Sequence, residues 1–94
     1  MKLSEISREQ IKAFCGISGD ESDEVLDIIS AGSRSFICGY TGLSEEETDA
    51  HEELSMAFLV LVNEMFTTRT LSVDGANINP FARQILDMHR TNLL

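Results

Sequence analysis

The 94-residue chain has few of the features that mark membrane or exported proteins. It has one proline and no tryptophan, and its central apolar run, residues 56–62, ends at Asn63 and Glu64. That run is far shorter than the roughly 20 apolar residues that a bilayer-spanning helix requires. Ser4 and Glu5 interrupt any signal-peptide core near the N-terminus. The sequence therefore predicts a single cytosolic globular domain with no membrane association.

Cysteines are scarce as well. Cys15 and Cys38 each lie beside a glycine, and neither has a second cysteine or a histidine at metal-ligand spacing. A disulfide would need an oxidising compartment, which nothing else in the sequence indicates. We expect two buried free thiols.

Basic residues are outnumbered: seven Lys and Arg face sixteen Asp and Glu, for a net charge of -9. Residues 1–53 hold thirteen acids and four bases, whereas residues 54–94 hold three of each. Such a surface repels phosphate groups, which argues against a sequence-reading DNA-binding domain. It remains compatible with a passage through which DNA slides without sticking.

The acids of residues 20–27 invite a calcium interpretation, which their spacing does not support. An EF-hand loop needs glycine at its sixth position, and Val25 stands there when Asp20 is the first. Acidic residues in the first turn of a helix are stabilised by its dipole, so a helix start is the preferred interpretation. An electrostatic surface for a partner remains the alternative.

No catalytic set is recognisable. His51, Glu52 and Glu53 lack the paired-histidine spacing of zinc proteases, and His89 is the only other histidine, so a solvated helix start is predicted. Glu64 and Glu53 have no accompanying nucleophile. Gly39 and Gly42 lack the lysine and the preceding strand of a phosphate loop. The sequence predicts no enzyme, no cofactor and no metal ligand.

Local signals predict two helices in the first half. Ser7 and Gln10 form a capping box before residues 8–15, and Gly16 ends that helix. A second helix is expected over residues 21–38, closed by glycines 39 and 42. Gly32, with a small residue on each side, predicts close approach of another helix, and a slight kink is the alternative. The expected buried stripe comprises Val25, Ile28, Ile29, Gly32, Phe36 and Tyr40, with Leu26 and Ile37 on its flank.

The third helix, residues 49–69 with Asp49 as its cap, is apolar nearly all round. One stripe consists of Leu54, Ala57, Phe58, Leu61, Val62 and Met65. Met56, Leu59, Val60 and Phe66 fall outside that stripe. Such a helix must be covered on more than one side, either by its own fold or by a neighbouring subunit.

The last helix is predicted over residues 80–90, with Asn79 as its cap, Pro80 in the first position, and a stripe through Phe81, Ile85 and Met88. Residues 67–79 contain a turn pair, Asp74-Gly75, and predict a long loop or short hairpin that is a candidate contact segment.

The predicted fold class is therefore all-α: a small bundle of four main helices with a long loop or short hairpin between the last two. The predicted core residues are Phe14, Val25, Ile29, Phe36, Leu54, Phe58, Leu61, Met65, Phe81 and Ile85. The candidate interface residues are Met56, Leu59, Val60, Leu71, Val73, Leu93 and Leu94.

The order of these segments resembles a known family. It runs from a short first helix with Ile11-Lys12-Ala13-Phe14 through the acidic turn at residues 20–24 to Phe36-Ile37-Cys38-Gly39-Tyr40-Thr41-Gly42. An apolar helix around Phe58-Leu59-Val60-Leu61-Val62 and a last helix from Asn79-Pro80-Phe81 to Leu94 follow. This arrangement is similar to the head-tail connector, or head-completion adaptor, proteins of tailed bacteriophages and prophages, which are often described as DNA-packaging proteins.

The resemblance implies a structural virion protein that assembles as a ring between the portal protein and a tail or head-closure protein. It implies a place in the virion neck, and in the host cytoplasm during assembly, with DNA passing and no sequence-specific binding. Head-to-tail rings use two different faces of each subunit, which suits a helix that is apolar on several sides. The alternative is an acidic helical interaction module or regulatory adaptor unrelated to phage assembly, as a monomer or dimer.

Overall fold

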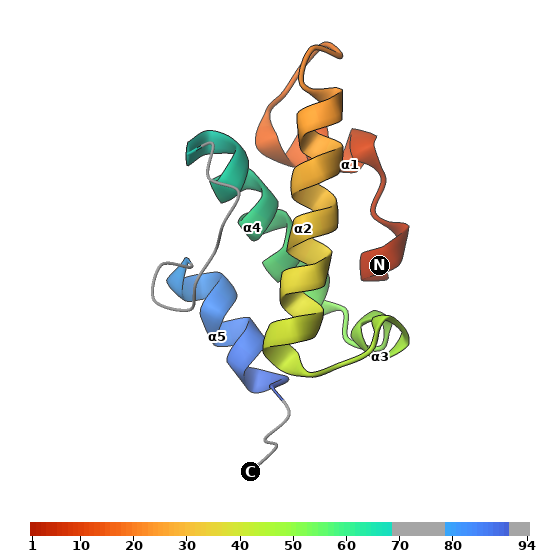
Figure 1. The fold of residues 1–94 in the computed structure, drawn as a ribbon, viewed down its shortest axis with the longest axis vertical. Helices are drawn as coiled ribbons and strands as arrows, with labels where there is room; N and C mark the ends of the chain where they lie inside the picture. Colours follow the sequence, from red (N-terminus) through yellow and green to blue (C-terminus); the bar gives the residue numbers. More distant parts are fainter. Residues whose placement is uncertain (69–78, 91–94) are drawn as a thin grey trace.

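A computed structural model describes residues 1–68 and 79–90, and within these ranges the chain is helical with no strand (Figure 1). The elements are a 3-10 turn, η1 (Leu3–Glu5), and the helices α1 (Arg8–Cys15), α2 (Asp23–Thr41), α3 (Glu45–Asp49), α4 (Glu53–Thr68) and α5 (Pro80–Met88). The predicted all-α fold is confirmed. Most of the predicted loop or hairpin, residues 69–78, lies outside the described residues, while Thr67 and Thr68 belong to α4.

Helix α4 lies at the centre of the packing. It contacts α2, α5 and α1, while α5 also packs on α2 and the short α3 packs on η1 (Figure 1). The buried side of α4 comprises Leu54, Ser55, Ala57, Phe58, Leu61, Val62 and Met65. Its fully buried apolar side chains form the middle of the hydrophobic core. None of the helices in the described part of the chain is both long and apolar enough to cross a membrane.

Several helix ends follow the predicted local signals. The Ser7 hydroxyl accepts a hydrogen bond from the Gln10 backbone N–H, and the Gln10 side chain accepts one from the Ser7 N–H, so α1 begins with the predicted capping box. Gly16, with φ of 71°, ends α1 in the left-handed conformation that glycine adopts without strain. The Asn79 side chain accepts from Phe81 and Ala82 at the start of α5.

Several predicted boundaries were wrong: α2 begins at Asp23 and not at residue 21, and α5 ends at Met88 and not at residue 90, while residue 69, the predicted end of α4, lies outside the described residues. The two largest differences lie at the end of α2 and the start of α4. Helix α2 continues through Gly39 to Thr41 and ends at Gly42, where φ is 78°. Gly39 keeps a helical conformation, so it does not stop the helix. Asp49 does not cap α4: it is the last residue of α3, and its carboxylate accepts hydrogen bonds from the Ser4 N–H at 2.9 Å and the Ser4 hydroxyl at 2.6 Å.

The buried face of α2 is displaced by one residue from the predicted stripe. It comprises Leu26, Ile29, Ser30, Ser33, Ile37 and Thr41. Ile28 is 56% exposed, and a Cβ placed on Gly32 would meet nothing within 4 Å, so the predicted close approach at Gly32 was wrong. One residue corresponds to about 100° of rotation. Ser33 instead faces α4, where its hydroxyl lies 3.7 Å from the Met65 sulfur.

The same displacement occurs in α5. Phe81 is 53% exposed and Met88 is 69% exposed, whereas Ala82 and Leu86 are fully buried. The prediction of Phe81 as a core residue was therefore wrong. The buried face of α5 carries the small side chain of Ala82, which allows its helix axis to come close to its neighbours.

Phe14, another predicted core residue, is 42% exposed. The core beside α1 is filled instead by Ile11 together with Leu3 and Ile6 from the preceding segment. The other predicted core residues are buried or pack partly buried against the core. Ile29, Leu54, Phe58, Leu61 and Met65 are buried, and Val25, Phe36 and Ile85 are partly buried.

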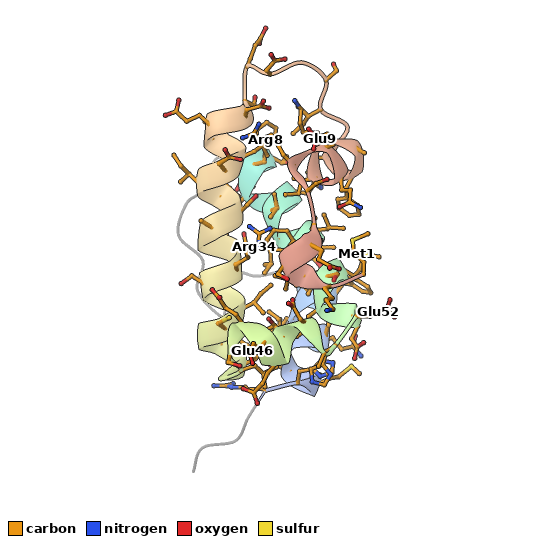
Figure 2. The ribbon with its side chains drawn as sticks, turned by 90° about the vertical axis from the view of Figure 1, so that its right-hand side faces the viewer. Met1, Arg8, Glu9, Arg34, Glu46 and Glu52 are labelled. Carbon is orange, nitrogen blue, oxygen red and sulfur yellow. The ribbon has the colours of Figure 1, made fainter. Side chains whose placement is uncertain are left out.

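Polar side chains of α2 join it to both ends of the chain. The Arg34 guanidinium lies 4.7 Å from the centre of the Phe58 ring and donates a hydrogen bond to the Ile6 carbonyl at 3.3 Å, reaching toward the N-terminal segment (Figure 2). The Tyr40 hydroxyl donates to Asp87 Oδ1 at 2.6 Å, which ties α2 to α5.

Candidate assembly surfaces

The outer side of α4 presents less apolar surface than the sequence suggests. Met56 is 45% exposed, whereas Leu59 and Val60 are half-buried and pack against the core. Met56 is therefore the most accessible of the three candidate interface residues on this helix. The other candidates, Leu71, Val73, Leu93 and Leu94, lie outside the described residues.

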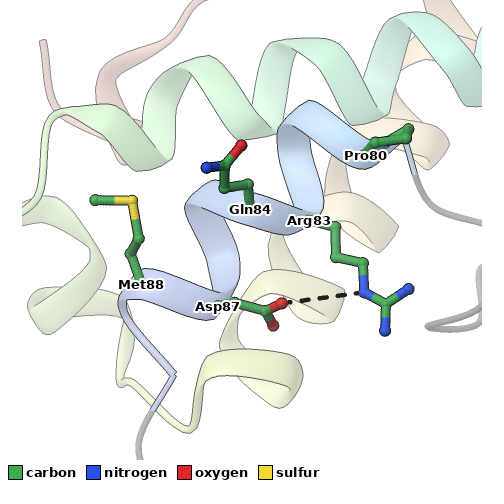
Figure 3. Close-up of a pocket in the computed structure, with 5 residues that line it drawn as sticks. All are labelled: Pro80, Arg83, Gln84, Asp87 and Met88. Carbon is green, nitrogen blue, oxygen red and sulfur yellow. Dashed lines mark ion pairs between the residues drawn. The ribbon is translucent and has the colours of Figure 1, made fainter.

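The outward side of α5, which we call the α5 face, carries two large exposed apolar side chains, Phe81 and Met88. It consists of Pro80, Phe81, Arg83, Gln84, Asp87 and Met88. A shallow hollow of about 470 Å³ runs along it (Figure 3). Arg83 Nε and Asp87 Oδ2 lie 4.0 Å apart on one side of the hollow. An apolar partner bordered by charged groups would fit this surface.

Exposed apolar side chains also occur near the other end of α2. Phe14 on α1 and Ile28 on α2 are both exposed. Ion pairs attach α1 to the first turns of α2, whereas the hydrogen bond of Tyr40 places α5 beside its last turn. Tyr40 lies 13 positions along the chain from Asp27, the partner of Arg8, so the two contacts lie about 20 Å apart along α2.

Some of the acids of residues 20–27 hold α1 in place. The Arg8 guanidinium lies 2.6 Å from the Asp27 carboxylate and 3.4 Å from that of Asp23, and Lys12 Nζ lies 2.9 Å from Asp23. The hydrogen bond from Arg8 lowers the pKa of the Asp27 carboxyl. These acids therefore hold α1 by ion pairs and also stabilise the positive end of the α2 dipole.

The remaining negative charge is exposed at both ends of α2. Asp20, Glu21 and Glu24 are exposed at its start, and α3 presents three more acids after its end. Figure 2 shows Arg8 near the first end and Glu46 near the other. On α3, the Ser44 backbone N–H lowers the pKa of the Glu47 carboxyl by hydrogen bonding. The described molecule is thus anionic at both ends of α2.

The sequence did not predict that His51, Glu53 and His89 meet. Their ligand-type atoms all lie within 4.8 Å of one another, His89 Nε2 is 2.6 Å from Glu53 Oε1, and the two imidazole rings are 4.2 Å apart at their centres. Only 13% of the His89 side chain is exposed, so the prediction of a solvated helix start was incomplete. Packing of α5 on α4 brings these residues together, and no local spacing could have indicated it.

Both cysteines are free and half-buried. Burial raises the pKa of the Cys15 thiol, and it also raises that of Cys38, to which the charge of Glu45 adds. Thiols shifted in this direction are predominantly protonated at neutral pH and are weak nucleophiles.

These surfaces define a small acidic helical protein with separate exposed apolar sites suited to protein contacts. The sequence model of the Phage gp6-like head-tail connector protein family matches residues 6–87, so the chain belongs to that family. The resemblance predicted from the sequence is confirmed. No curated protein matches the chain, and no solved structure matches it.

Proposed function

We propose that the protein is a ring-forming head-tail connector subunit that lies in the virion neck, between the portal protein and a tail or head-closure protein. Membership of the connector family supports this role. The role is structural: the ring forms a docking platform and a seal, with no chemical turnover.

The observation that carries this proposal is the separation of the exposed apolar sites. Phe14 lies on α1, which ion pairs bind to the first turns of α2, while Phe81 and Met88 lie on α5, whose Asp87 contacts Tyr40 near the end of α2. A head-to-tail ring joins one face of each subunit to a different face of the next. Two unlike apolar surfaces on different helices meet that requirement.

The charge distribution supports passage of DNA through such a ring. Affinity for duplex DNA depends largely on cationic groups that neutralise phosphates. The exposed acids at both ends of α2 disfavour that neutralisation. DNA could then move during packaging or ejection with little adhesion to the subunit.

The test is to examine purified protein by native mass spectrometry and negative-stain microscopy, alone and mixed with the portal protein of the same phage. We expect rings bound to the portal. The absence of both rings and portal binding would overturn the proposal, and a stable monomer or dimer that binds an unrelated protein would favour the adaptor alternative.

A Phe81→Asp variant refines this test. Because Phe81 is 53% exposed, the subunit should keep its fold and lose ring formation. Gln84→Asp, on the same α5 face, adds the same charge without removing an apolar anchor and is the matched control. Equal assembly by both variants would exclude the Phe81 side chain from the subunit contact.

A further inference from the structure

We propose that His51, Glu53 and His89 form a binding site for Zn²⁺ that joins the start of α4 to the end of α5. This site is independent of the connector function. Its ligands come from two regions of the sequence that only the folded helix pair brings together.

The geometry is close to what the ion needs. Ligand atoms that surround one Zn²⁺ at about 2.0–2.2 Å in a tetrahedron are roughly 3.4 Å from one another. The nitrogen and oxygen atoms of the three side chains already lie within 4.8 Å of one another. Binding therefore requires the side chains to rotate: the 2.6 Å contact between His89 Nε2 and Glu53 Oε1 opens, and the longer separations close.

Rigid backbone holds the two histidines. The His51 N–H donates to the Thr48 carbonyl at 3.3 Å, and the His51 carbonyl accepts from the Leu54 N–H at 3.1 Å. The His89 N–H donates to the Leu86 carbonyl at 3.1 Å. Leu54 and Leu86 are themselves fully buried, so the core fixes both ligand positions.

Two of the ligand atoms already meet. His89 Nε2 is buried and lies 2.6 Å from Glu53 Oε1, and among the described residues this contact lacks hydrogen-bond geometry. An ion held by both side chains would satisfy the buried nitrogen. The Glu53 side chain is 47% exposed, so an ion can enter from solvent and water can take the fourth position.

The donor set narrows the kind of ion. Two imidazoles and one carboxylate suit Zn²⁺ and related transition-metal ions, whereas Ca²⁺ and Mg²⁺ prefer oxygen ligands throughout. Its own backbone N–H lowers the pKa of the Glu53 carboxyl.

The experiment uses the purified full chain with Zn²⁺ in titration calorimetry and with Co²⁺ as a spectroscopic probe. We expect one ion per chain, visible absorption of tetrahedral Co²⁺, and shifts in the imidazole resonances of both histidines, the only two in the chain. At about 100 times the dissociation constant, Zn²⁺ should raise Tm on the order of 10 °C.

Variants locate the site. His51→Ala and Glu53→Gln should each lose the cobalt spectrum and the rise in Tm, while Glu46→Gln, an exposed acid on α3, should keep both. His89→Gln is added because this side chain is largely buried, and circular dichroism without metal checks that each variant folds. Unchanged imidazole resonances, binding that survives in the folded histidine variants, or a thiolate charge-transfer band would overturn the proposal.

Discussion

Buried hydroxyl side chains occupy part of the inward surface of α2. They explain why the predicted buried stripe of this helix was displaced by one residue. Ser33 is fully buried, and the Thr41 hydroxyl donates to the Ile37 carbonyl at 2.7 Å. A serine or threonine that bonds locally is inexpensive to bury, so polarity alone does not place it on the surface. A prediction that counts apolar residues therefore assigns burial to the neighbouring face of α2, and this face is the wrong one.

Ser33 yields a prediction in which a more hydrophobic side chain lowers the stability of the fold. Ser33→Leu raises hydrophobicity, yet it should destabilise the fold by about 1–3 kcal/mol because the packed contact with Met65 leaves no room for it. Urea unfolding measures the change. Ser33→Ala is the control and should stay within about 1 kcal/mol, since the hydrogen bond to sulfur is weak. A stabilised Ser33→Leu would contradict this packing.

The contact between Arg8 and Asp27 yields a prediction for pH. The folded-state pKa of Asp27 is lowered from its ordinary value of 3.8, so the stabilisation is present above that value and is lost as pH falls through the lowered one. In Arg8→Met the Asp27 carboxyl should titrate near the ordinary value by NMR. An unchanged titration would show that Arg8 does not bind Asp27 in solution.

Helix ends were more predictable than helix faces, and the reason is physical. The box of Ser7 with Gln10 and the cap at Asn79 depend on residues at most three positions away. Which face of a helix is buried depends on the position of its partners, and these come from distant sequence. In α4, apolar residues are numerous enough to mark the buried side; in the two-turn α1, they are not.

The candidate sites show the same contrast between what local sequence predicts and what depends on the packing of distant segments. An interface role for Met56 was predictable as a departure from the stripe, and it stays a prediction. The exposure of Phe81 was not predictable, because its position looks like core until Ala82 is seen to face inward. The meeting of His51 with His89 depends entirely on the packing of α5 against α4.

Gly32 supports a prediction for α2 as an element. Its Cβ position is open and its backbone is helical, so Gly32→Ala should stabilise the isolated subunit by about 0.5–1 kcal/mol. Thermal unfolding tests this expectation. Gly42→Ala is the contrasting variant: its φ of 78° makes alanine strained there, and it should destabilise the protein. The same sign of change in both would contradict the assigned end of α2.

At the scale of the whole molecule, the exposure of each α4 side chain determines whether its substitution affects folding, assembly or both. Val60 is half-buried against the core, so aspartate there would disturb both processes. Met56 is 45% exposed, so a substitution there tests assembly without disturbing the core.

Met56→Asp should change the free energy of unfolding by about 0.5 kcal/mol or less and should weaken assembly with the portal protein. Leu61→Asp should unfold the subunit, because Leu61 is only 2% exposed and an isolated charge there has no partner. Circular dichroism and sedimentation measure the two effects. Unimpaired assembly of Met56→Asp would remove the outer side of α4 from the interface.

The hydrogen bond between Tyr40 and Asp87 has an optical consequence. Tyr40 is the only tyrosine in the chain, and there is no tryptophan. Its ring lies 4.9 Å from the Arg90 guanidinium carbon, and its hydroxyl donates to a carboxylate on α5. A carboxylate bonded to the phenol quenches tyrosine emission, so fluorescence excited near 280 nm reports, without any label, whether α5 is docked on α2. Tyr40 is thus an intrinsic probe of the contact between α5 and α2.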